Sequence, residues 1–325
     1  MKTEIIILTE AGEKFGYGHL MRCLAIAQGF MAAGIDSVFY IRGDAEPDRI
    51  LNEFEWSCLE WLENTPDVKG RIVIVDSYYS DEAFCKMIYH KAGRVLFIDD
   101  YNRIAYPGGF VLNSVIGAEE IGYPENSSIT YLLGPKYHPL RREFWDVPEK
   151  VINREVKKIL VTFGGTDMTN ETPGVLRYLK THYPELEKHV IIGKGFSNID
   201  EINEAADDKT VLIMNADAEV MKNEMMECDV AISAAGQTIY ELARVGVPSM
   251  GFCVVENQIK NFLVWERAGI FYFLNTISDK NAIMHISNIM TDILSFDIRV
   301  RINMEVKKLM SRDSTQKICE LLISN

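Results

Sequence analysis

The chain has 325 residues, of which 47% are hydrophobic and 25% are charged, and its formal net charge at neutral pH is −13. This length predicts two domains of about 150 residues each, and the composition is typical of a folded globular protein rather than a disordered or fibrous one. The acidic excess extends over both halves, which excludes nucleic-acid wrapping and docking to an anionic membrane as main functions, because both need a basic surface.

The six cysteines lack the CxxC spacing of zinc or redox sites, and we interpret them as reduced thiols. The apolar residues before Glu10 are too few for an export signal or a membrane span. We therefore expect a cytoplasmic protein, in which the glycosylation sequon at 126–128 is a chance occurrence.

The first half alternates short apolar runs with longer helical patterns, which is typical of βαβ units with buried parallel strands. Helices are expected at 19–33 and 81–92, each followed by a glycine at the C-cap position, Gly34 and Gly93. The expected strands are 4–8, 37–41, 72–75, 95–98, 110–112 and 130–133.

A proline and mixed charges between 146 and 156 predict a domain boundary, so we divide the chain into domains 1–150 and 151–325. From about residue 282 to the end the pattern predicts two helices, the last folding back on the first domain. The second series of strands is expected at 158–163, 190–192, 211–214, 230–233, 249–254 and 271–274. The fold class is thus α/β, with two doubly wound, Rossmann-like domains facing a cleft, and ligands in such sheets bind at the carboxyl ends of the strands.

The first strand leads into a glycine-rich loop that ends at His19. Gly12, Gly16 and Gly18 permit positive φ and close approach of a ligand, but their spacing does not match the dinucleotide fingerprint. An imidazole in the first turn of a helix lies at the positive end of the helix dipole, which favours its neutral, proton-accepting form. We predict that His19 is a general base; the alternative is a histidine that only caps or packs at the helix start.

Two further strand ends place polar residues at the same edge as His19. They are D-S-Y-Y at 76–79 and D-D-Y-N at 99–102. We expect these groups to line one pocket with His19, whereas the alternative for each acid is a helix cap or loop anchor. No His or Cys partner supports a metal at Asp99 and Asp100.

In the second half, G-G-T-D at 164–167 precedes a helix expected at 172–182. Backbone N–H groups of such a turn, with the hydroxyl of Thr166, make an anion cradle, although an ordinary strand-to-helix turn has the same sequence features. The small residues 233–236 expose the start of a second helix at 237–245, with Glu241 placed to accept ribose hydroxyls. Asn257 and Gln258 lie at a further helix start, where amides also act as caps.

At these residues the chain resembles the UDP-2,4-diacetamido-2,4,6-trideoxy-β-L-altropyranose hydrolases of pseudaminic acid biosynthesis, relatives of the glycosyltransferase-B group. The shared motifs keep their order and extend over most of the chain to about residue 270. They are G-Y-G-H-L-M-R-C-L-A at 16–25, D-S-Y at 76–78, F-I-D-D at 97–100, L-N-S at 112–114, Y-L-L-G-P-K-Y-H-P-L-R-R-E-F at 131–144, F-G-G-T-D at 163–167, I-S-A-A-G-Q-T-I-Y-E at 232–241 and N-Q at 257–258.

The resemblance implies hydrolysis of a UDP-linked diacetamido-trideoxyhexose at the anomeric C–O bond, releasing UDP and free sugar with inversion, in nonulosonic (pseudaminic) acid biosynthesis. His19 would activate water, and Tyr78 and Asn257 would orient the substrate near the reacting centre. The residues expected at the UDP-sugar are Gly16, Gly18, Arg22, Gly165, Thr166, Ser233, Ala235, Gly236, Thr238, Glu241 and Gln258. The expected protein needs no cofactor or metal, has no nucleic-acid or membrane partner, and acts as a monomer.

Two alternatives stay open. A glycosyltransferase would use the same cradle to pass the sugar to an acceptor hydroxyl. Residues 1–150 hold 15 basic and 23 acidic residues, against 19 and 24 in the remainder, so the more acidic first half favours a soluble acceptor such as water. A non-catalytic subunit would bind the nucleotide-sugar without turnover, and the presence of His19 and Tyr78 counts against it.

Overall fold

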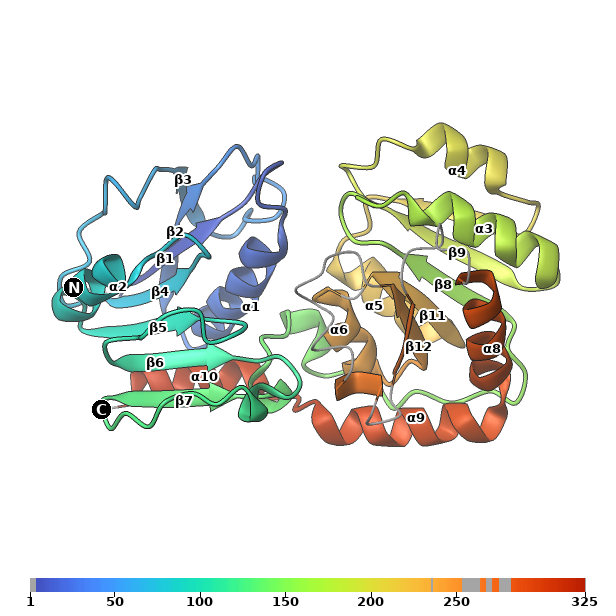
Figure 1. Cartoon of the computed structure of the whole chain (residues 1–325). Helices are drawn as coiled ribbons and strands as arrows, with labels where there is room; N and C mark the ends of the chain where they lie inside the picture. Colours follow the sequence, from blue (N-terminus) through green and yellow to red (C-terminus); the bar gives the residue numbers. More distant parts are fainter. Residues whose placement is uncertain (1–3, 235, 253–263, 267–270, 275–281, 325) are drawn as a thin grey trace. The chain divides into compact units, whose positions relative to one another are not determined.

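The computed structural model describes residues 4–234, 236–252, 264–266, 271–274 and 282–324. It divides into two compact units, Met1–Trp145 with Ser311–Asn325, and Asp146–Met310 (Figure 1). Each unit is built around one parallel sheet with helices packed against it. The predicted α/β class is confirmed.

The first unit contains a seven-stranded parallel sheet in the order β3-β2-β1-β4-β5-β6-β7. The order reverses between β1 and β4, which is the topological switch point of a doubly wound sheet. The strands are β1 Glu4–Glu10, β2 Asp36–Arg42, β3 Glu55–Cys58, β4 Ile72–Asp76, β5 Arg94–Ile98, β6 Gly109–Asn113 and β7 Ile129–Leu133. The helices of this unit are α1 Gly18–Ala32, α2 Glu82–Lys91 and α10 Ser314–Ile323, with 3-10 turns η1 Ala118–Glu120, η2 Pro135–Tyr137 and η3 Arg142–Phe144.

Alternate residues of β1 face two different cores. Ile5 and Ile7 pack in the cluster that includes α1 and α10, whereas Ile6 and Leu8 pack in the cluster that includes Trp61 and α2. This two-residue period is why the central strands read as continuous apolar runs, since both faces are buried.

The close contact between α1 and α10 depends on Gly29. A Cβ at this position would lie 2.6 Å from Sγ of Cys319 on α10, so the missing side chain lets the two helices approach. The C-terminal helix therefore belongs to the core of the first unit.

The second unit contains a six-stranded sheet, in the order β10-β9-β8-β11-β12-β13 within the described residues. Its strands are β8 Lys158–Thr162, β9 Glu187–Ile192, β10 Thr210–Met214, β11 Val230–Ala234, β12 Ser249–Phe252 and β13 Phe271–Leu274. Its helices include α3 Glu171–His182, α4 Ile199–Ala205, α5 Ala218–Glu227, α6 Thr238–Val245, α8 Ala282–Leu294 and α9 Phe296–Leu309.

The prediction of two helices after residue 282 was wrong, because the described residues there form three: α8, α9 and α10. The apolar pattern continues through Ser295, which adopts an extended conformation between α8 and α9. Serine before the helix and Asp297 in its first turn are start signals that a periodicity argument passes over. Strand β3 was also missed, because it is short and lies at the sheet edge with mostly exposed residues.

The two predicted glycine caps differ. Gly34 has φ +77° directly after α1, as expected for a left-handed residue that ends a helix. Gly93 was predicted for the same role wrongly, because α2 ends with an extended Ala92. Gly93 is required for packing instead, since a Cβ there would lie 2.7 Å from the carbonyl oxygen of Gly70.

Within the described residues, no helix combines the length and apolar character needed to cross a bilayer. The cysteines that the structure describes are all free: Cys23, Cys58, Cys85, Cys228 and Cys319.

Candidate active site at the carboxyl edge of the first sheet

Three segments of the first unit bring polar side chains to the switch point. His19 is the second residue of α1, Asp76 is the last residue of β4, and Asp100 lies just after β5. Because β1, β4 and β5 are parallel neighbours, their carboxyl ends share one edge of the sheet. His19 and Tyr78, which were predicted to lie together, are in contact there.

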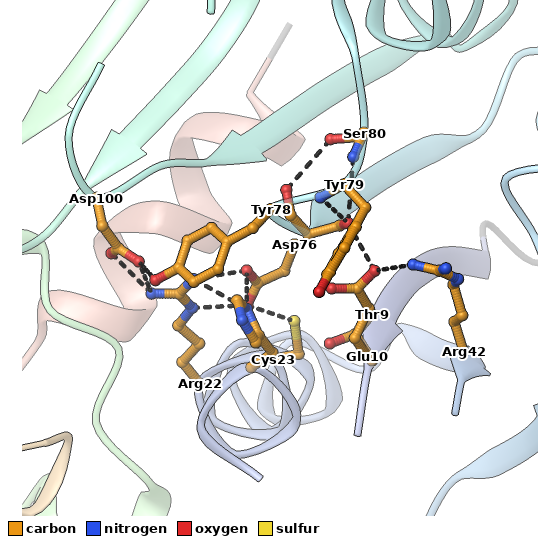
Figure 2. A network of polar contacts seen from close by, with 12 residues as sticks. Thr9, Glu10, Arg22, Cys23, Arg42, Asp76, Tyr78, Tyr79, Ser80 and Asp100 are labelled. Carbon is orange, nitrogen blue, oxygen red and sulfur yellow. Dashed lines mark hydrogen bonds and ion pairs between the residues drawn. The ribbon is translucent and has the colours of Figure 1, made fainter. Parts of the chain in front are cut away.

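Asp76 is the centre of this site. Its carboxylate is fully buried, and Oδ1 lies 2.7 Å from Nδ1 of His19. Arg22, one turn along α1, donates from Nε to Oδ2 and from Nη2 to Oδ1, both at 2.6 Å (Figure 2). The same guanidinium donates from Nη1 to both oxygens of Asp100, at 2.8 and 3.0 Å. Arg22 thus forms ion pairs with two carboxylates, of which Asp76 also contacts the imidazole of His19.

The charges around Asp76 decide its protonation state. Burial alone would raise the pKa of Asp76, but the charge of Arg22 and the contact with His19 outweigh it and hold the pKa well below its usual range. Burial would likewise lower the pKa of Arg22, yet Asp100 and Asp76 raise it above its usual value. Both side chains are therefore charged at neutral pH.

A charged Asp76 also fixes the tautomer of His19. A carboxylate only accepts hydrogen bonds, so the short contact requires Nδ1 of His19 to carry the hydrogen. Nη2 of Arg22 lies farther from Nδ1, at 3.2 Å, and already donates to Asp76. In the unprotonated ring Nε2 then holds the lone pair, and among the described residues no hydrogen bond reaches it. This is the arrangement of a general base supported by a carboxylate.

Tyr78 closes one side of the imidazole. Its ring meets that of His19 edge to face, with centroids 4.7 Å apart and planes at 79°. Its hydroxyl donates to Oδ2 of Asp100 (Figure 2). Burial, followed by the charge of Asp100, raises the pKa of Tyr78 well above its usual range, so the phenol stays protonated at neutral pH.

The two consecutive acids after β5 have different roles. Asp100 contacts Arg22 and Tyr78, whereas Asp99 accepts hydrogen bonds from the backbone N–H of Asn102 at 2.7 Å and from the hydroxyl of Tyr123 at 2.5 Å. Asp99 is therefore a loop anchor. In the part of the chain that the structure describes, no three His, Cys, Asp or Glu side chains gather as metal ligands.

The glycine-rich loop before His19 is closed on itself. Gly12 and Gly16 exchange backbone hydrogen bonds of 3.1 and 2.8 Å, and a Cβ on Gly12 would lie 1.8 Å from Oδ1 of Asp44. Gly12 is thus needed for packing against the turn after β2. Gly16 and Gly18 have no atom within 4 Å of a built Cβ, which leaves open space beside the start of α1.

The first predicted anion cradle, the turn at 164–167, leads into a helix whose start carries its own cap. The carboxylate of Asp167 accepts hydrogen bonds from the backbone N–H groups of Glu171 (2.9 Å) and Thr172 (3.1 Å). Two backbone N–H groups at the start of α3 are therefore capped by an anion of the chain itself, which disfavours a phosphate at these two groups because like charges repel. Gly165 and Thr166 stay exposed in the turn before this cap.

The second predicted cradle, at α6, carries no such cap from Gln237, the residue before the helix. Gln237 precedes the helix without a side-chain hydrogen bond to it, and Gly236 has open space where a side chain would project. Thr238 opens the helix, and Glu241 lies in its first turn, 9% exposed. Ser233 is buried and its hydroxyl donates to the carbonyl of Ala234, so this predicted ligand is occupied within its own strand.

Three predicted site residues, Ala235, Asn257 and Gln258, lie outside the described residues. Arg22 was predicted as a substrate contact, but it is 5% exposed and all its nitrogens bond within the Asp76–Asp100 cluster. Its position indicates that it holds the carboxylates in place. From the sequence, Asp76 and Asp100 could be identified only as members of the polar segments that follow two strands. The one sequence signal that pointed to Asp76 was an acidic residue at the end of β4.

The comparisons with known proteins come from sequence and from structure. No family model matches the chain. An uncharacterized protein of Methanocaldococcus jannaschii is 28% identical over 267 residues, which cover 75% of this chain and 54% of that protein. The pseudaminic acid cytidylyltransferase and UDP-2,4-diacetamido-2,4,6-trideoxy-beta-L-altropyranose hydrolase of Helicobacter pylori is 25% identical over 260 residues, 79% of this chain and 45% of that protein. The chain thus spans about half the length of these two relatives.

A third relative matches along its length. The spore coat polysaccharide biosynthesis protein SpsG of Bacillus subtilis is 22% identical over 334 residues, covering 97% of this chain and 96% of that protein. Among solved structures, Acinetobacter baumannii MurG covers 98% of this chain and 99% of its own, with a TM-score of 0.64 and 14% identity. The rhamnosyltransferase SpnG also has a TM-score of 0.64, at 10% identity, and covers 99% and 100%. The chain has the two-domain parallel-sheet fold of the glycosyltransferase-B group.

Proposed function

We propose that this protein hydrolyses a UDP-linked 2,4-diacetamido-2,4,6-trideoxyhexose at the anomeric C–O bond, releasing UDP and a free sugar of inverted configuration. The observation that carries the proposal is the Asp76–His19 pair at the switch point, in which a hydrogen on Nδ1 makes Nε2 the proton acceptor of the unprotonated ring. The relatives from H. pylori and B. subtilis, a UDP-sugar hydrolase and a polysaccharide biosynthesis protein by name, support a reaction on a UDP-sugar in polysaccharide biosynthesis.

The chemical step needs one base and one anion-stabilising site. Nε2 of His19 takes a proton from water as the water oxygen bonds to the anomeric carbon. The C–O bond to the diphosphate breaks, and its electron pair leaves with UDP. Asp76 stabilises the imidazolium that forms, and the proton then passes to solvent. General-base catalysis of this kind contributes about 10²–10⁴ in rate.

The residues around His19 hold its imidazole in a fixed orientation. Arg22 and Asp100 fix the Asp76 carboxylate, and Tyr78 packs against the imidazole ring. We assign Tyr78 and the predicted residue Asn257 to orienting the substrate. Positioning of a single water against the sugar is worth several kcal/mol in effective-molarity terms.

We assign UDP to the second unit. The uncapped start of α6 at Gly236 offers backbone N–H groups and the positive end of a helix dipole to the leaving diphosphate. Gly165 and Thr166 add an exposed turn, and Glu241 is placed to accept ribose hydroxyls. The leaving group is already anionic and needs no strong acid.

Incubation with the UDP-linked diacetamido-trideoxy sugar, without an acceptor, tests the proposal. The anomeric protons and UDP are followed by NMR, and free sugar of inverted configuration is expected. The structural neighbours favour one alternative, glycosyl transfer, in which the same base deprotonates an acceptor hydroxyl. Substrate that stays intact until an alcohol is added would establish transfer, and binding without turnover would establish a nucleotide-sugar-binding subunit.

A further inference from the structure

A second cluster joins the same two loops as the catalytic pair. Phe15 precedes His19 on the β1–α1 loop, and Tyr79 follows Tyr78 after β4. The rings of Phe15 and Tyr79 meet edge to face, with centroids 5.6 Å apart and planes at 88°. The loops are thus linked by two aromatic pairs, of which only the His19–Tyr78 pair is used by the proposed chemistry.

Two cations flank the Phe15–Tyr79 pair. The guanidinium carbon of Arg42 lies 4.9 Å from the Tyr79 centroid, and Nζ of Lys14 lies 5.2 Å from the centroids of both rings. These distances are within the range of cation–π attraction. Arg42 is neutralised by Glu10 at 3.0 Å and Glu60 at 2.9 Å. Lys14 is exposed and has no ion pair with any described residue.

The cluster also contains an acceptor that lacks a donor. Glu10 is fully buried, and its Oε1 accepts hydrogen bonds from Ser77 at 2.8 Å and Arg42 at 3.0 Å (Figure 2). Its Oε2 is buried without a hydrogen-bond partner among the described residues. Tyr79, by contrast, is 50% exposed, so its ring is accessible to a ligand.

We propose that Lys14, Phe15 and Tyr79 form the subsite that recognises an acetamido group of the sugar. An acetamido group presents a methyl group, a carbonyl oxygen and an N–H. The aromatic pair offers an apolar surface for contact with the methyl group, and the ammonium of Lys14 is a hydrogen-bond donor for the carbonyl oxygen. The buried Oε2 of Glu10 is not accessible to the N–H; Glu10 contributes by binding Arg42, whose guanidinium lies over the Tyr79 ring.

This inference rests on the proposed function and adds the group that sets its specificity. A sugar with a free amino group would place a second cation beside Lys14 and would lose the methyl contact. The subsite therefore discriminates by attraction for the acylated sugar and by repulsion of the unacylated one.

The experiment compares three substrates: the diacetamido UDP-sugar, its counterpart with a free amine at position 2, and its counterpart with a free amine at position 4. Wild-type protein is expected to prefer the diacetamido sugar over one of the two amines by about 10- to 100-fold in kcat/KM. Tyr79→Ala and Lys14→Met are expected to reduce that preference to about threefold or less. The position at which preference is lost identifies the acetamido group that is bound.

Tyr101→Ala is the matched control. Tyr101 lies at the same edge, contacts Tyr78 with ring centroids 5.6 Å apart and is 47% exposed, but no described cation lies over its ring. It is expected to change kcat/KM for all three substrates by the same factor. Unchanged preference in both Tyr79→Ala and Lys14→Met would overturn the subsite.

Failure of the proposed function gives a different result. If wild-type protein releases no UDP from any of the three sugars, the comparison is made on dissociation constants from isothermal titration. A wild-type preference for the acetamido sugar that Tyr79→Ala abolishes supports the subsite without catalysis, and equal constants for the three sugars overturn it.

Discussion

The Asp76 carboxylate at the end of β4 lies 2.7 Å from Nδ1 of His19 at the start of α1, although 57 residues separate them in the chain. This contact converts an ordinary strand end and an ordinary helix start into a base with a defined tautomer. Replacement of either residue is therefore expected to impair the proposed base.

Replacement of the base is the most direct test of the chemistry. His19→Ala is expected to lower kcat at least about 100-fold, which is the scale of general-base catalysis. The affinity for UDP, measured by isothermal titration, should stay nearly unchanged because His19 is not assigned to the nucleotide. His189→Ala is a matched control, since His189 lies on β9 of the second unit, where it pairs with Glu224 at 2.6 Å, and has no assigned role. Full turnover in His19→Ala would refute the role.

Asp76→Asn keeps the size of the side chain but removes the charge that orients the imidazole. We expect kcat to fall by about 10²–10⁴, because an amide does not hold Nδ1–H and stabilise imidazolium as a carboxylate does. The variant also leaves Arg22 with one carboxylate fewer, and breaking a buried ion pair costs about 3–5 kcal/mol. Rates should therefore be measured below the melting temperature of the variant, where a loss of rate reports the base and not unfolding.

The low pKa of Asp76 also predicts how stability depends on pH. The unfolded chain binds a proton at Asp76 near pH 4, whereas the folded chain binds it only at lower pH. Its contribution to the free energy of unfolding is therefore complete above about pH 4 and is lost as the pH falls through the folded-state pKa. Urea titrations between pH 3 and pH 7 should show a stability gap between wild type and Asp76→Asn that narrows towards pH 3. A gap that widens at low pH would contradict the assignment.

The two helix starts of the second unit should respond differently to substitution. Gly236→Val fills the open space at the uncapped start of α6 and should weaken UDP binding at least about tenfold, since the close approach of the phosphate is blocked. Asp167→Ala removes the cap of α3 and should cost about 1 kcal/mol of stability while UDP affinity changes little. Titration calorimetry with UDP and thermal denaturation separate the two effects. The reverse pattern would place the diphosphate at α3.

The packing of α10 on α1 is testable without a substrate. Gly29→Val places a branched side chain where Cys319 and Thr315 already lie within 3 Å of a built Cβ. We expect a loss of about 1–3 kcal/mol in the free energy of unfolding of the first unit, as for other overpacked cores. Gly34→Ala is a weaker comparison, because no atom crowds that position and only the positive φ opposes it. Equal free energies of unfolding for Gly29→Val and wild type would contradict the close packing of α10 on α1 at this position.

Much of the fold was accessible from local patterns. The central strands of both sheets were predicted within a few residues, because strands buried on both faces are continuous apolar runs. Edge strand β3 was missed because it is short and mostly exposed, and the break at Ser295 was missed because the apolar pattern continues through it. The closed ring between Gly12 and Gly16 was missed for a different reason: glycine permits both an open loop and a tight one, and the turn around Asp44 decides between them.

By itself, the sequence determined the α/β class, the positions of the strand ends, and His19 and Tyr78 as candidates, since each depends on residues close together in the chain. Only the tertiary structure decided that Asp76 is the partner of His19, that Arg22 is buried between two carboxylates, and that Asp167 caps the start of α3. Hydrogen bonds and ion pairs act over about 3 Å, and strand order together with the folded path of each loop brings residues to that distance.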